Sequence, residues 1–131
     1  MRGGPAEHGL VLDAGALIAY ERGDRLAVGL IERAKERGAA VTVPVGALAQ
    51  VWRDGRLQVR LVRLLSSAFC EVVPLDDFGA REAGQLLGVT GTSDVVDATV
   101  VRCARQRGLP VLTSDTGDLR RLDRKVRLIP V

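Results

Sequence analysis

Short apolar runs alternate along the chain with longer segments in which apolar residues recur at helical spacing. Five runs rich in Val, Leu and Ile predict buried strands bounded by turn residues or proline. These are residues 9–14 (GLVLDA), 39–44 (AAVTVP), 70–75 (CEVVPL), 109–114 (LPVLTS) and 126–131 (VRLIPV). The segments between them predict helices over residues 24–38, 47–67, 76–88, 94–106 and 115–122.

Turn and capping residues set the ends of the predicted helices. Gly38 and Gly108 follow the last apolar positions of two helices and are typical C-terminal stops. An aspartate opens the helix of residues 76–88, and Asp94 precedes another as a candidate N-cap. The pair Asp54-Gly55 predicts a possible break within residues 47–67.

The repeated alternation of strand and helix indicates an α/β fold with a central parallel sheet and helices on both faces. With 131 residues the chain has the size of one domain. We expect residues 1–8 to be a flexible N-terminus and residues 9–131 to form that domain. Aromatic residues make up only 3% of the chain, so the core must consist of Val, Leu and Ala.

The composition also bounds the environment of the protein. No apolar run approaches the roughly 20 residues of a membrane-spanning helix, and residues 1–9 (MRGGPAEHG) lack the apolar centre of a signal peptide. Cys70 and Cys103 are more typical of buried free thiols than of a disulfide. We therefore expect a cytoplasmic protein without membrane contact. His8 is the single histidine and lies in the expected flexible terminus, so histidine catalysis is not expected.

A net charge of +3 and a pI near 9.4 permit a nucleic-acid partner. Arg56, Arg60 and Arg63 repeat at helical spacing, and Arg53 joins them if the helix continues through Gly55. This arginine face is either an ordinary solvated helix face or a phosphate-binding one. We predict Arg53, Arg56 and Arg60 as candidate RNA contacts.

Aspartates follow two of the predicted strands and begin two of the predicted helices. Asp13 ends the first strand, Asp115 follows the fourth, Asp94 and Asp97 begin a helix, and Asp118 lies one turn beyond Asp115. In open α/β sheets, functional sites gather at the carboxyl ends of strands. Gathered carboxylates repel one another and are costly to desolvate unless a cation occupies the site. Oxygen ligands without His or Cys favour Mg²⁺ or Mn²⁺, ions that commonly serve phosphate chemistry.

Four segments, in this order, resemble the motifs of the PIN domain family and especially its VapC-type toxins. They are VLDAGALIAY, VPVGALAQVWR, DATVVRCA and VLTSDTGDL, and the resemblance extends over nearly the whole chain from Gly9. It implies a three-layer α/β/α PIN-like fold with a central parallel sheet, and the activity of a Mg²⁺-dependent endoribonuclease. It also implies RNA as substrate, a VapB-like antitoxin as partner, and a homodimer.

The resemblance assigns candidate roles to individual residues. Asp13, Asp97 and Asp115 match the catalytic, metal-binding acids of the family, and Asp94 is similar to an extra acid found in some members. Thr113 matches the threonine before the last acid, and Asp118 is an auxiliary acid one step beyond the family position, where Gly117 stands.

Two departures concern the active site. Gln50 stands where the family carries its second acid, a glutamate, so the site is one negative charge short unless Asp94 or Asp118 compensates. Gly15 stands where a small polar residue is common, two positions after the first aspartate.

Three other readings remain open. Asp13 at a strand end is also a feature of phosphoacceptor domains and of phosphotransferases of the haloacid dehalogenase type. The latter require a second aspartate two positions later, where Gly15 stands, and the acids and lysine of a receiver-like domain are not evident. The main alternative is a PIN module with weak or no activity that acts by binding nucleic acid or protein.

Overall fold

The computed structural model describes residues 8–131 and contains a central five-stranded sheet. Its strands are β1 (Gly9–Leu12), β2 (Ala40–Pro44), β3 (Cys70–Val73), β4 (Val111–Thr113) and β5 (Leu128–Pro130). Every neighbouring pair is parallel, and the spatial order is β3-β2-β1-β4-β5. The strand order reverses between β1 and β4, and such a switch point opens a crevice at the carboxyl edge of a parallel sheet.

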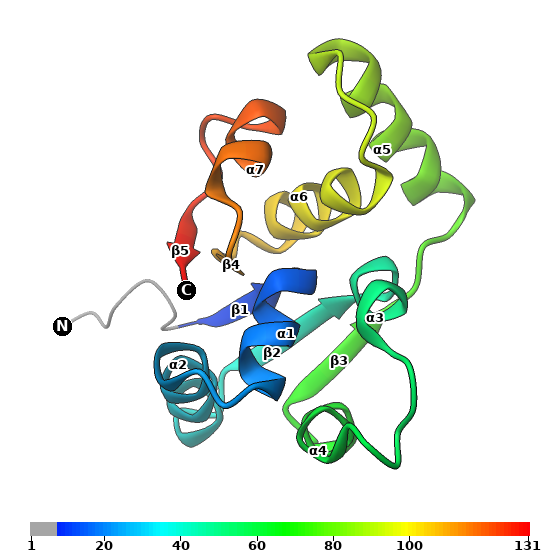
Figure 1. Cartoon of the computed structure of the whole chain (residues 1–131). Coiled ribbons are helices and arrows are strands. Elements are labelled where there is room, and N and C mark those ends of the chain that lie inside the picture. Colours follow the sequence, from blue (N-terminus) through cyan, green and yellow to red (C-terminus); the bar gives the residue numbers. More distant parts are fainter. Residues whose placement is uncertain (1–7) are drawn as a thin grey trace, which may run out of the picture.

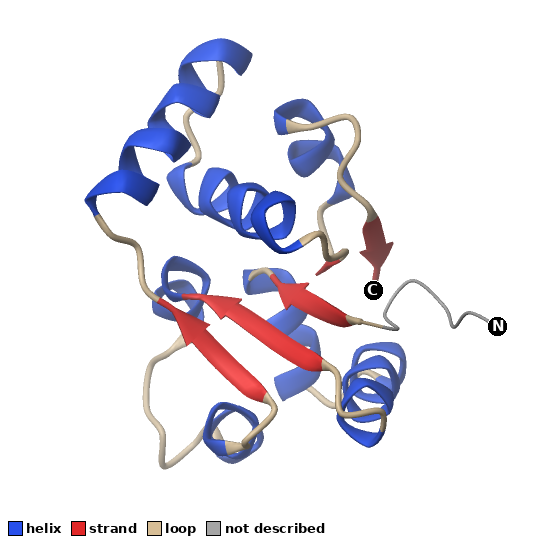
Figure 2. Ribbon diagram, turned by 180° about the vertical axis from the view of Figure 1, so that it is seen from behind, coloured by secondary structure: helices blue, strands red, loops and turns tan. Residues whose placement is uncertain are grey.

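Seven helices are present in this part of the chain. They are α1 (Ala14–Glu21), α2 (Arg25–Glu36), α3 (Val45–Val51), α4 (Val59–Ser66), α5 (Asp77–Thr90), α6 (Val95–Arg107) and α7 (Thr116–Leu122). Figures 1 and 2 show α1, α2 and α4 on one side of the sheet and α5, α6 and α7 on the other. α3 follows β2 and packs against both α1 and α6. The predicted three-layer α/β/α arrangement with a parallel sheet is confirmed.

The core lies between the sheet and its two helical layers. β1 is buried along its whole length, as expected for a central strand covered on both faces. The largest fully buried side chains are aliphatic and come from strands and helices alike: Leu10, Leu12, Leu17, Ile31, Leu61, Leu64, Leu112 and Leu119. No helix among residues 8–131 combines the length and apolar character needed to cross a bilayer.

The five predicted strands and most of the predicted helices are present. α6 begins at its N-cap Asp94 and ends at Gly108, whose φ of 67° is the left-handed conformation that favours glycine. α5 is capped by Asp76, whose carboxylate accepts a hydrogen bond from the Gly79 backbone N–H at 2.7 Å. The expected flexible N-terminus falls, apart from His8, outside the described residues.

Two helical details differ from the prediction. The helix α1 was not predicted from its pattern, because a short, almost wholly apolar segment lacks the periodicity that identifies an amphipathic helix. The segment of residues 47–67 is divided at Asp54-Gly55 into α3 and α4, as the break signal indicated. The helix does not continue through Gly55, so Arg53 does not join the arginine face, and Arg56 also lies outside α4.

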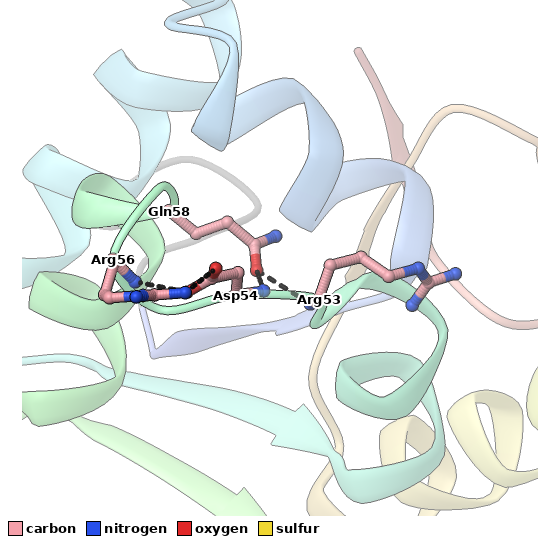
Figure 3. Close-up of polar contacts among 4 residues, drawn as sticks. All are labelled: Arg53, Asp54, Arg56 and Gln58. Atoms are coloured by element: carbon pink, nitrogen blue, oxygen red, sulfur yellow. Dashed lines mark hydrogen bonds and ion pairs between the residues drawn. The ribbon is translucent and has the colours of Figure 1, made fainter.

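Gln58 holds the connection between α3 and α4 together (Figure 3). Its side chain is 7% exposed. Its Oε1 atom accepts hydrogen bonds from the backbone N–H groups of Arg53 and Asp54, at 2.8 and 3.0 Å. Its Nε2 atom donates to the Val51 carbonyl and to the Glu21 carboxylate, at 3.0 and 3.1 Å. The conformation of this loop, and with it the position of Arg53, is fixed by one buried amide.

Candidate active site

Asp13 and Asp115 lie on either side of the point between β1 and β4 where the strand order reverses. Asp13 follows β1 directly, and its neighbour across the sheet edge is Thr113 at the end of β4. The Thr113 hydroxyl donates to Asp13 Oδ2 at 2.5 Å and accepts from the Asp115 backbone N–H at 2.8 Å. Thr113 therefore links the two acids, which stand 102 positions apart in the sequence.

Three of the helices around the acids are capped by an aspartate. Asp13, Asp94 and Asp115 are the N-caps of α1, α6 and α7. Their carboxylates accept hydrogen bonds from the backbone N–H groups of Ala16, Asp97 and Asp118, respectively, at 2.8, 2.9 and 3.3 Å. Helix N-termini stabilise negative charge, so this arrangement partly offsets the repulsion among the acids.

The electrostatics show that the carboxylates act on one another. The pKa of Asp97 is raised to about 6, first by burial and then by the charges of four other aspartates: Asp94, Asp13, Asp118 and Asp115. Burial also raises the pKa of Asp13 above its ordinary value, although Thr113 and Ala16 hydrogen-bond to it, and the charge of Asp115 adds to the rise. The pKa of Asp118 is raised chiefly by its hydrogen bond and charge interaction with Asp115. Carboxylates from three distant segments thus share one electrostatic environment.

A hollow of about 270 Å³ opens beside this cluster. Asp94, Asp97 and Asp118 line it together with Arg121, whose guanidinium lies 3.5 Å from the Asp118 carboxylate. Arg121 was not among the predicted site residues. Its place in the hollow follows from the short helix α7, which turns Asp118 and Arg121 to the same side.

The donor chemistry of the cluster fits a hard divalent cation, because every available ligand is a carboxylate or hydroxyl oxygen. In residues 8–131, however, no three His, Cys, Asp or Glu side chains stand ready to hold a metal ion. Asp13, Asp94 and Asp115 each direct one oxygen toward a helix N-terminus. To hold one ion jointly, Asp13, Asp97 and Asp115 must turn toward one another.

The remaining predicted site residues lie elsewhere or are already paired. Gln50 is exposed and lines a separate hollow with Ile18, Glu21, Arg22, Val51 and Arg53. Within residues 8–131 no hydrogen bond joins the Gln50 side chain to an aspartate of the cluster, so its assignment to the second acidic position stays a prediction.

The three arginines predicted to bind RNA differ in their surroundings. Arg56 is held by Asp54 through two hydrogen bonds, at 3.1 and 2.9 Å, as Figure 3 shows. Arg60 donates to the Glu21 carbonyl at 3.4 Å, and Arg53 donates to the Trp52 carbonyl at 2.7 Å. Arg53 lines the same hollow as Gln50 and is not ion-paired in the described part of the chain. Arg60 is likewise exposed and not ion-paired in the described part of the chain, so Arg53 and Arg60 are both available to a phosphate, whereas Arg56 is paired with Asp54.

Comparison with known proteins gives one family. The model of the PIN domain matches residues 10–125. Comparison of the sequence with curated proteins gives no match.

Solved structures of the same fold have low sequence identity. VapBC2 from Rickettsia felis, bound to a DNA fragment from its promoter, superposes with a TM-score of 0.72 at 14% identity, over 93% of this chain and 98% of that one. VapC20 from Mycobacterium tuberculosis, described as a toxin that cleaves the sarcin-ricin loop, gives 0.64 at 18% identity, over 83% and 92% of the two chains. PAE2754 from Pyrobaculum aerophilum gives 0.62 at 18% identity, over 91% and 89%. These likenesses establish a shared fold.

Proposed function

This chain belongs to the PIN domain family, and we propose that it is a divalent-metal-dependent endoribonuclease, the toxin of a VapBC-type toxin–antitoxin pair. The observation that carries the proposal is the set of aspartates at the β1/β4 switch point, where Asp97 has a pKa of about 6 because of burial and four neighbouring charges. An acidic hollow without a cation would repel the phosphates of RNA, so the cluster supports a bound metal ion.

We assign Asp13, Asp97 and Asp115 to hold Mg²⁺ or Mn²⁺, with Asp94 as a further acid beside them. The bound ion would supply polarisation of a phosphoryl oxygen and a nucleophilic water at neutral pH. Thr113 orients Asp13 and Asp115 through the two hydrogen bonds of its hydroxyl. Asp118 places a carboxylate beside Arg121, which offers a cation to the RNA backbone at the rim of the hollow.

The nuclease proposal also suggests which macromolecules this chain binds. Several solved neighbours are complexes of a toxin with its antitoxin, including VapBC2 from Rickettsia felis and a toxin–antitoxin complex from Klebsiella pneumoniae. We propose an antitoxin of the VapB type for this chain, a homodimer, and RNA contacts at Arg53, Arg56 and Arg60. Residues 9–131 are proposed as one PIN-like domain.

The direct test of the nuclease proposal is an assay of the purified full-length chain on a labelled RNA. We expect internal cleavage with Mn²⁺, slower cleavage with Mg²⁺ because that ion gives up its water reluctantly, and none with EDTA. Cleavage that persists in EDTA would contradict metal dependence. RNA retained without cleavage at any metal concentration would favour the alternative, a PIN module that acts by binding.

A further inference from the structure

Gly15, in the first turn of α1, has no room for a side chain. A Cβ atom built on Gly15 would lie 2.0 Å from the Ser114 Oγ atom and 3.0 Å from the Ser114 Cβ atom. Gly15 does not have a positive φ, so its backbone conformation alone would accept other residues. A side chain at position 15 would therefore require the Ser114 hydroxyl to move from the space that it occupies.

The position of Ser114 is fixed by its neighbours. It lies between Thr113, which is fully buried and bound to Asp13, and Asp115, the N-cap of α7. The backbone N–H of Asp115 is itself bound to Thr113 at 2.8 Å. Ser114 is exposed to solvent, yet the packing of Gly15 against its Oγ atom limits where the hydroxyl points.

The Ser114 hydroxyl is an uncommitted hydrogen-bond donor in an acceptor-rich edge. The Thr113 hydroxyl and the Asp115 N–H already have acceptors, and Ala16 N–H donates to Asp13. The Ser114 hydroxyl, by contrast, makes no hydrogen bond to any residue of the described chain. A phosphate oxygen that enters between Asp13 and Asp115 meets carboxylates there, and this hydroxyl is a neutral donor for it.

We propose that the Ser114 hydroxyl donates a hydrogen bond to a non-bridging oxygen of the scissile RNA phosphate, and that Gly15 is there to leave the hydroxyl this position. The inference rests on the proposed nuclease function and extends it to the side chain that contacts the substrate. It differs from metal ligation, since Ser114 adds no charge to the acidic cluster.

The test begins with Ser114→Ala, an exposed substitution that removes one hydroxyl and no internal hydrogen bond. We expect kcat/KM for RNA cleavage in Mn²⁺ to fall about tenfold, the loss of one hydrogen bond to a charged group. The rise in melting temperature caused by Mn²⁺ should equal that of the wild type. Ser66→Ala, at an exposed serine at the end of α4, is the matched control and should leave both quantities unchanged.

A swap of the two residues tests the geometry first through stability and then through RNA cleavage. Gly15→Ser alone should lower the melting temperature, because its Cβ atom meets the Ser114 hydroxyl. In a Ser114→Gly background the same substitution should cost much less stability. The double variant carries a hydroxyl on the α1 side of the same space and should cleave at least about threefold faster than Ser114→Gly alone.

The outcomes separate this inference from the function on which it rests. A wild type that cleaves RNA, with Ser114→Ala within about twofold of it, overturns the inference alone. Loss of the Mn²⁺ effect in Ser114→Ala assigns the hydroxyl to the metal and overturns the phosphate contact. A wild type that cleaves no RNA overturns the nuclease proposal and the role of Ser114 together. Equal stability costs of Gly15→Ser in the two backgrounds contradict the packing argument.

Discussion

Replacing Asp97 with asparagine is expected to reduce metal-dependent RNA cleavage by about a hundredfold or more, while the metal-free protein becomes more stable. The loss of activity is the size expected when a group that stabilises the transition state is removed. The gain in stability follows from the neighbouring charges, because Asp97 is ionised at neutral pH against Asp94, Asp13, Asp118 and Asp115. We expect the melting temperature in EDTA to rise by about 2–5 °C at pH 7.5.

The pH dependence of this gain has a defined sign. The pKa of Asp97 is raised to about 6 from an ordinary value of 3.8, so the folded protein binds the proton more tightly than the unfolded chain. The unfavourable contribution of Asp97 is therefore absent below about pH 4, grows as the pH rises to about 6, and is complete above it. The difference in melting temperature between Asp97→Asn and wild type should follow the same course.

The matched control is Asp77→Asn, which neutralises an exposed aspartate in the first turn of α5 that pairs with Arg81. It should change neither the Mn²⁺ effect nor cleavage. Thermal melts from pH 4 to 8, with EDTA or Mn²⁺, measure both parts of the prediction. Equal stabilisation of wild type and Asp97→Asn by Mn²⁺ would remove Asp97 from the ligand set.

The second large effect is expected when Asp94 is replaced, because Gln50 brings no negative charge to the second acidic position. Asp94 lines the same hollow as Asp97, and of the neighbouring charges it raises the pKa of Asp97 most. Gln50 lines a different hollow. We therefore expect Asp94 to be the compensating acid. Asp94→Asn should reduce cleavage by about tenfold or more, since it removes a negative charge beside the metal-binding carboxylates.

The choice of asparagine and the control variants separate the effect of the Asp94 charge from its role as an N-cap. Asparagine is as good an N-cap as aspartate, so α6 should keep its first turn. Asp24→Asn neutralises the N-cap of α2, outside the acidic cluster, and should leave RNA cleavage unchanged. Gln50→Glu should not increase RNA cleavage more than the control Gln85→Glu does. Gln85 is an exposed glutamine on α5. A tenfold increase with Gln50→Glu, together with an active Asp94→Asn, would assign the missing role to position 50.

The sequence was sufficient to predict the strands and the clustering of acids, because strand ends in a parallel sheet meet at one edge whatever their separation in the chain. Asp13 and Asp115 could be paired in this way. The sequence could not show that Thr113 bridges them, since the bridge depends on the register of β1 and β4. Nor could it show that Gly15 adjoins Ser114, whose Oγ atom lies 2.0 Å from the place where a Cβ atom at position 15 would stand.

The arginine spacing shows what the local sequence pattern could not predict. Their spacing predicted a helical face, and the face depended on whether the helix continued through Gly55. It does not, because Gln58 satisfies the backbone N–H groups of Arg53 and Asp54 in an irregular loop. The Asp54-Gly55 pair indicated the break, but the buried amide that replaces the helical hydrogen bonds is a tertiary feature, which local spacing does not predict.

The central claim is that one divalent ion binds where β1, β4 and α6 meet. Crystals of the full-length chain equilibrated with Mn²⁺ and measured near the manganese absorption edge test it most directly. We predict a single strong anomalous peak within ligand distance of Asp13, Asp97 and Asp115, absent from crystals of Asp97→Asn prepared in the same way. Wild-type crystals without a peak at saturating Mn²⁺, or with the peak away from these three carboxylates, would contradict the account.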